Sequence, residues 1–193
     1  MPEGVYQFDG HGGDGTPIWS QIGPPKQGCL AGKWGVVGFR GWITDDFYHY
    51  SGTPNLWELI GGPTANSDMV VGQDTVYRKG SDWAIYQYNG TGTSWTQITA
   101  PLVNHAIVMQ YGLFGLVYTD FDTNSMYRYL GTPNQWLRIG PHRPYFAVTD
   151  ETVYAIPMDK SGVYRYDGGT NWTNIRPGPV GDQINGPMIT ATD

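Results

Sequence analysis

The chain contains little cysteine, little charge and no long apolar run. Cys29 is the single cysteine among 193 residues, which excludes an intrachain disulfide framework. No stretch approaches the roughly 20 apolar residues that a membrane-spanning helix needs, so we expect no membrane insertion. The 11 Lys and Arg residues are scattered among 17 Asp and Glu residues, and only Arg78 and Lys79 are adjacent. Because nucleic-acid affinity comes from clustered cations that neutralise phosphates, we do not expect nucleic acid as a partner.

Motifs for catalysis, metal binding and secretion are also missing. The four histidines show no His-x-x-x-His spacing and there is no Cys-x-x-Cys, so we expect no metal site. Neither Gly-x-Ser-x-Gly nor a Gly-rich phosphate loop occurs, so we expect no catalytic residue, no cofactor and no enzyme. The start, Met1 to Gly4, lacks the basic and apolar regions of a signal peptide. We therefore expect a cytoplasmic protein, with release or secretion left open.

Turn formers and aromatic residues are abundant. The chain has 28 Gly, 14 Pro, 14 Tyr and 8 Trp, and only 15% of its residues are charged. Aromatic residues favour strands, and Gly and Pro favour tight turns. This composition predicts short strands joined by turns.

One module of about 40 residues occurs five times. Each copy has an aromatic-x-aromatic-x-Gly step, then a Trp, and an Ile three residues after that Trp. The aromatic steps are Tyr6-Phe8-Gly10, Tyr48-Tyr50-Gly52, Tyr86-Tyr88-Gly90, Tyr127-Tyr129-Gly131 and Tyr164-Tyr166-Gly168. The Trp/Ile pairs are Trp19/Ile22, Trp57/Ile60, Trp95/Ile98, Trp136/Ile139 and Trp172/Ile175.

Each module predicts four short strands, which we call a to d. Strand a is a short apolar run around Val71, Val108 or Val148, and strand b contains Val76-Tyr77, Leu116-Val117-Tyr118 or Val153-Tyr154-Ala155. Strand c carries the aromatic step, whose period of two places both rings on one face. Strand d begins at the repeated Trp. Four antiparallel strands in about 40 residues is the size of a β-propeller blade.

The two ends of the chain complement each other. The chain begins with strands c and d, over 4–8 and 19–22, and ends with what should be strands a and b, near 183–184 and 188–191. We therefore predict an all-β, five-bladed β-propeller of four-stranded antiparallel blades. It forms a single domain over 1–193, closed by N- and C-terminal strands in one composite blade.

This repeat architecture resembles the tachylectin type of five-bladed lectin along the whole chain, without close sequence identity. The resemblance implies binding of N-acetylated sugars at one shallow site per blade or blade junction. The Gly-Gly-Trp that ends each tachylectin unit is replaced here, for example by Gly61-Gly62-Pro63. The sugar specificity is therefore not carried over.

Three groups of residues are candidates for glycan binding. An indole ring stacks on a pyranose ring, and a neighbouring carboxylate or amide can bond its hydroxyl groups. Packing between blades is the favoured alternative for the repeated Trp residues, and turn formation for the Asn residues. For Trp42 and Trp83, which lie outside the repeat, filling of a blade junction is equally weighted. The candidates are Trp57, Trp95, Trp136 and Trp172; Trp42 and Trp83 with Asp46 and Asp82; and Asn55, Asn134 and Asn171.

The sequence thus predicts a lectin with repeated, shallow sites for N-acetylated or other neutral sugars, whose partners are glycans or glycoproteins. The alternative is a non-catalytic propeller that binds a peptide or partner domain on one face. The oligomeric state is left open.

Overall fold

The structure is a computed structural model. It describes residues 3–26, 28–40, 46–61, 69–82, 84–99, 114–117, 125–141, 145–148, 152–157 and 159–180. Within these ranges the chain forms strands and turns, with no helix. The predicted all-β class is therefore confirmed.

The strands follow one another in five groups along the chain. They are β1 (Val5–His11) and β2 (Pro17–Gly23); β3 (Gly28–Gly32), β4 (Gly35–Arg40), β5 (Asp46–Tyr50) and β6 (Trp57–Gly61); β7 (Met69–Val71), β8 (Val76–Lys79), β9 (Ile85–Tyr88) and β10 (Trp95–Gln97); β11 (Phe114–Val117), β12 (Ser125–Tyr129) and β13 (Trp136–Pro141); and β14 (Tyr145–Val148), β15 (Val153–Ile156), β16 (Gly162–Gly168) and β17 (Asn171–Pro177).

Each group is one antiparallel sheet in which chain neighbours pair. Three sheets have four strands, in the orders β3-β4-β5-β6, β7-β8-β9-β10 and β14-β15-β16-β17. The described part of the fourth module gives the three-stranded sheet β11-β12-β13, and β1 pairs with β2. Strands a to d of the repeat are therefore confirmed wherever they are described. The strands expected near Val108 and over 183–191, and Tyr118 of strand b, lie outside the described residues.

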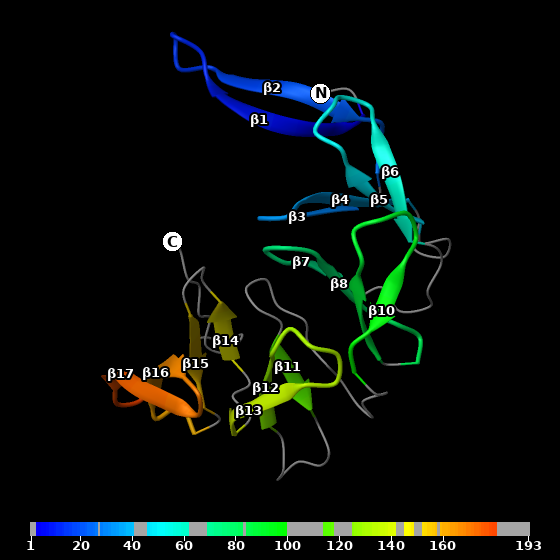
Figure 1. Ribbon diagram of the computed structural model, residues 1–193. Coiled ribbons are helices and arrows are strands. Elements are labelled where there is room, and N and C mark those ends of the chain that lie inside the picture. Colours follow the sequence, from blue (N-terminus) through cyan, green and yellow to red (C-terminus); the bar gives the residue numbers. More distant parts are fainter. Residues whose placement is uncertain are drawn as a thin grey trace.

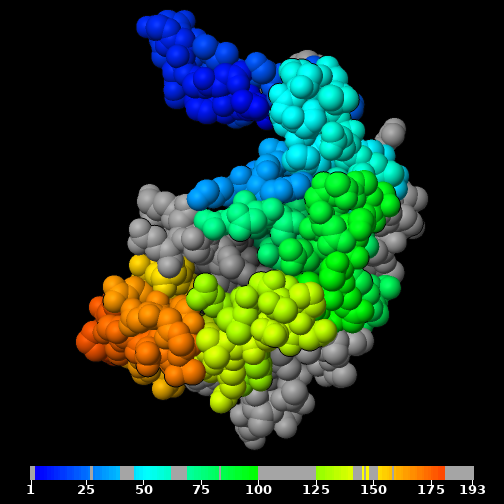
Figure 2. All heavy atoms as spheres, viewed as in Figure 1, coloured from blue at the N-terminus to red at the C-terminus, as the bar shows by residue number. Residues whose placement is uncertain are grey.

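The sheets follow one another round an arc, with β1–β2 at one end and β14–β17 at the other (Figure 1). In the space-filling view the β1–β2 hairpin projects from the remaining sheets (Figure 2). Among the described strands, no ladder joins β1 or β2 to another sheet, so the described residues do not show the predicted closure of the composite blade.

The core lies between neighbouring sheets. Three buried clusters each take residues from two successive sheets, so the sheets pack face to face. In the junction between β3–β6 and β7–β10, Phe47 and Ile60 of the first sheet pack with Val76 and Tyr88 of the second. The residues of the other two clusters are Ile85, Ile98 and Tyr129, and Met126, Ile139, Val153 and Tyr166.

In every module the repeated Trp packs on the second aromatic residue of strand c. The two residues are directly opposite each other across the antiparallel c–d ladder. Their ring centroids are 5.1–5.3 Å apart in all five modules. The pairs are Phe8–Trp19, Tyr50–Trp57, Tyr88–Trp95, Tyr129–Trp136 and Tyr166–Trp172. The repeated aromatic step and the repeated Trp thus correspond to a cross-strand aromatic pair in each module.

The same Trp also joins its sheet to the preceding one. Its indole N–H donates to the main-chain oxygen of the Ile in strand d of the previous module, at 2.5–3.2 Å. We call this contact the indole–carbonyl bond. The four bonds are Trp57–Ile22, Trp95–Ile60, Trp136–Ile98 and Trp172–Ile139. An unsatisfied buried carbonyl is costly, so each bond stabilises its junction.

The glycine after the Ile allows the indole to approach. A Cβ on Gly23 would overlap Trp57 Nε1, and one on Gly140 would lie 3.0 Å from Trp172 Nε1. In these two modules the glycine that follows the Ile is therefore explained by the tryptophan of the next module.

We predict that Gly23→Ala destabilises the protein by about 1–3 kcal/mol, because the added methyl displaces the Trp57 indole from the Ile22 carbonyl. Gly13→Ala is the matched control, since a Cβ there meets nothing within 4 Å. Urea denaturation of both variants measures the difference. Equal stabilities for the two variants would contradict the role assigned to Gly23.

Candidate functional site

The c–d hairpin carries most of the candidate residues. Trp57, Trp95, Trp136 and Trp172 begin or lie near the start of β6, β10, β13 and β17, and all four are half-buried. One edge of each indole is committed to the indole–carbonyl bond, and the ring packs on its aromatic partner. Packing between sheets, the favoured alternative for these residues, is thus what the structure shows. Each of the four residues still keeps some exposed surface.

Asn55 and Asn134 have a main-chain role in the same junctions. Their backbone is left-handed, with φ of 66° and 63°, a conformation that Asn tolerates better than most residues. Each donates its main-chain N–H to the Ile carbonyl that also accepts the indole N–H. These distances are 2.9 Å to Ile22 and 2.8 Å to Ile98. Both side chains are exposed at the surface.

Asn171 differs from the other two asparagines. It lies in β17, opposite Gly168, and is exposed. The hairpin here is one residue shorter, since Trp172 follows Tyr166 by six positions where Trp57 follows Tyr50 by seven. The three Asn residues therefore do not form one repeated side-chain position.

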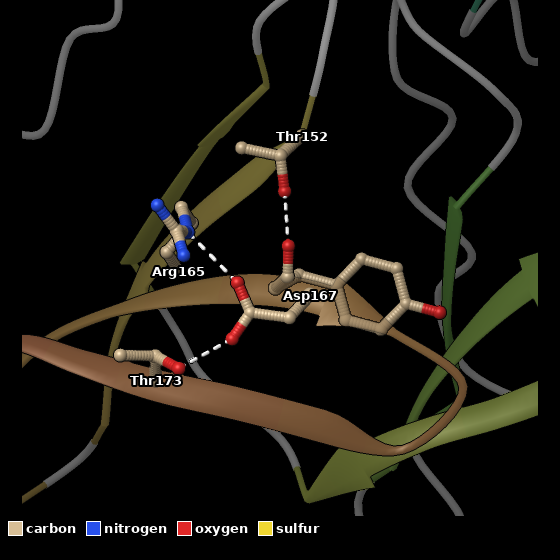
Figure 3. Close-up of polar contacts among 5 residues, drawn as sticks. Thr152, Arg165, Asp167 and Thr173 are labelled. Atoms are coloured by element: carbon tan, nitrogen blue, oxygen red, sulfur yellow. Dashed lines mark hydrogen bonds and ion pairs between the residues drawn. The ribbon is translucent and has the colours of Figure 1, made fainter.

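A polar cluster extends along the hairpin of the last sheet (Figure 3). Asp167 accepts hydrogen bonds from Arg165 Nε at 2.8 Å and from the Thr173 hydroxyl. These two bonds, that from Thr173 first, hold the pKa of Asp167 below its usual value. Behind the cluster, the Thr152 hydroxyl donates to the main-chain oxygen of Tyr166.

The equivalent hairpin of the third sheet repeats this arrangement with an amide in place of the acid. Thr96 Oγ1 donates to Asn89 Oδ1 at 2.9 Å, and Asn89 Nδ2 donates to Ser94 Oγ at 2.9 Å. Sequence reasoning missed these residues. The signal was available, since Asn89 and Asp167 both follow the second aromatic residue and Thr96 and Thr173 both follow the Trp.

Two junctions also place a cation against the aromatic rings. The Arg78 guanidinium carbon is 4.5 Å from the Trp95 ring centroid, and Lys26 Nζ is 5.2 Å from that of Trp57 and 4.5 Å from that of Tyr48. Burial lowers the pKa of Arg78. These cation–π contacts limit how much of Trp57 and Trp95 a ligand can reach.

Tyr86 contacts both Asp82 and Arg78. Tyr86 donates its hydroxyl to Asp82 Oδ2 at 2.8 Å, and its ring lies 5.9 Å from the Arg78 guanidinium. The bond to Asp82 raises the pKa of Tyr86. Asp82 also accepts the main-chain N–H of Ala84 at 3.1 Å. The carboxylate is exposed, so it is accessible to a ligand.

The remaining candidates are not brought together. Asp46 begins β5, at the end of that strand away from Tyr50 and Trp57, and its register partner is Arg40. Trp42 and Trp83 lie outside the described residues.

The described ranges contain no group of three His, Cys, Asp or Glu side chains arranged to hold a metal ion. The same part of the chain has no helix long and apolar enough to cross a bilayer. No protein-family model matches this sequence, and no curated protein matches it.

We predict that Thr173→Val raises the pKa of Asp167 toward its ordinary value, because the carboxylate loses the hydrogen bond that lowers its pKa most. A ¹³C NMR pH titration of the Asp167 carboxyl carbon measures the change. Thr96→Val is the control, since Thr96 bonds Asn89 and should leave Asp167 unchanged. A titration curve that is the same in Thr173→Val and in the unmodified chain would show that the bond does not form in solution.

Proposed function

We propose that the protein is a non-catalytic, carbohydrate-binding lectin whose c–d hairpins each offer a shallow glycan site. The observation that carries this proposal is the repeated pairing of a half-buried Trp with exposed hydroxyl, amide or carboxylate groups on one hairpin. The best example is the last sheet, where Trp172 lies between Asn171 and Thr173, and Asp167 lies across the ladder.

The chemistry of this arrangement suits a neutral sugar. The exposed part of an indole can stack on the apolar face of a pyranose. The neighbouring amide and hydroxyl groups can donate to and accept from sugar hydroxyls. Since most of each ring is already used in packing, one hairpin binds weakly. Repetition on one rigid chain raises the avidity for clustered glycans and glycoproteins.

The proposed scaffold is a five-bladed propeller. Three described sheets already have four antiparallel strands in chain order, and successive sheets pack face to face. The β1–β2 sheet has two strands, and we propose that C-terminal strands complete it as a composite blade. This scaffold would present up to five similar sites.

We predict that a glycan array shows binding to clustered neutral glycans, N-acetylated ones included. The variant for this test is Asn55→Gly/Asn134→Gly/Asn171→Ala. Glycine keeps the left-handed backbone at the first two positions, so the side-chain amide is removed without strain. Binding should fall by at least about tenfold on the array, since three of the repeated sites are weakened together.

Unchanged thermal unfolding of the triple variant is the control that separates lost binding from lost structure. Absence of binding to every glycan, together with a specific protein captured by the unmodified chain, would replace the lectin with the protein-interaction propeller.

A further inference from the structure

Every described junction between sheets has the same polarity. The earlier module supplies an Ile carbonyl as acceptor, and the later module supplies a Trp indole as donor. A sheet therefore has a donor face, with its aromatic–Trp pair, and an acceptor face, with its Ile. Within the described residues, the five modules leave one donor face and one acceptor face without a counterpart.

The unmatched donor face belongs to β1–β2. Trp19 and Phe8 are each 46% exposed. The tyrosines equivalent to Phe8 in the last three modules, Tyr88, Tyr129 and Tyr166, are 5–7% exposed because a preceding sheet covers them. An aromatic pair of the same geometry is thus left open to solvent.

The unmatched acceptor face belongs to the last sheet. Ile175 of β17 is 46% exposed, whereas the equivalent residues, which each bond a following Trp, are 0–4% exposed. Those residues are Ile22, Ile60, Ile98 and Ile139. A β-branched apolar side chain that is buried in four modules is open in the fifth.

We propose that these two faces dock on each other within one chain, with Trp19 Nε1 donating to the main-chain oxygen of Ile175 as a fifth indole–carbonyl bond. The occupant of the exposed β1–β2 face is then the β14–β17 sheet of the same molecule. Figure 1 shows these two sheets at the two ends of the arc. Docking within the chain is favoured over docking on a second copy because covalent linkage gives a high effective concentration.

The residue after Ile175 affects how closely the Trp19 indole can approach the Ile175 carbonyl. Three modules have glycine at this position, but the last has Arg176 and the third has Thr99. The Thr99 junction shows that a side chain is accommodated, since Trp136 still reaches the Ile98 carbonyl at 3.2 Å, the longest of the four bonds. The fifth bond should resemble the Trp136–Ile98 bond. The proposed docking rests on the propeller proposed above and is independent of whether the protein binds sugar.

Hydrogen exchange of the indole N–H groups tests this docking on the unmodified chain. ¹⁵N NMR resolves the tryptophan indole signals, which triple-resonance spectra assign to residues. We expect the Trp19 N–H to exchange with protection on the order of 100-fold or more over a free indole, as expected for a bond within a folded unit. The Trp57 N–H, already bonded to Ile22, is the internal reference.

Stability of matched variants gives a second readout. Trp19→Phe and Trp57→Phe each keep an aromatic pair and remove one indole N–H. Both should lower the melting temperature by several degrees, as expected for the loss of a buried bond. The protection of Trp19 should not change between dilute and concentrated samples.

Either of two results would overturn the proposal. One is free-indole exchange at Trp19 while Trp57 is protected, with Trp19→Phe as stable as the unmodified chain. The other is protection of Trp19 that appears only with a sedimenting dimer, since the face would then bind a second copy. Neither result depends on the glycan array, so failure of the lectin hypothesis and failure of this docking are distinguished.

Discussion

The hydrogen bond from an indole N–H to the isoleucine carbonyl of the preceding module is the contact on which the arrangement of the sheets depends. It fixes where each Trp lies, and through the cross-strand aromatic pair it fixes strand c as well. It also accounts for Gly23 and Gly140, because a side chain there would crowd the indole. Each junction involves neighbouring modules alone, so stability is expected to accumulate junction by junction, as in other repeat proteins.

The same contact limits what the tryptophans can do for a ligand. Trp95 and Trp172, for example, donate their indole N–H to a carbonyl and pack on Tyr88 and Tyr166. A ligand can therefore contact only the part of each residue that stays exposed. In the proposed lectin, recognition would then come mostly from the hairpin side chains, such as Asp167 and Thr173. This division of roles favours shallow sites, each weak by itself, over one deep pocket. It also explains why repeated tryptophans are a strong signal of fold and a weaker signal of function.

The sequence predicted the strands because their aromatic and apolar residues recur at fixed spacing. It did not locate β3 (Gly28–Gly32), a short strand in which glycines flank Cys29, Leu30 and Ala31. Trp34 is not one of the repeated tryptophans, and the structure gives it a junction contact, with its main-chain N–H donating to the Gly72 carbonyl at 3.0 Å. Asn55 is a candidate for glycan binding because of its side-chain amide, but the structure shows that the turn uses its left-handed backbone. Contacts between modules depend on how the sheets stack, which local spacing does not specify, so the bond from the Asn55 main-chain N–H to the Ile22 carbonyl could not be predicted.

The fixed direction of the junctions has a consequence for self-association. A face that donates cannot match a second donating face, so two molecules cannot pair donor face to donor face about a twofold axis. Any assembly built on them is heterologous, and it either ends when the two open faces of one chain meet or continues from copy to copy. A chain whose open faces are held apart would therefore be prone to polymerise, and the meeting of its own two ends is what would keep it a monomer.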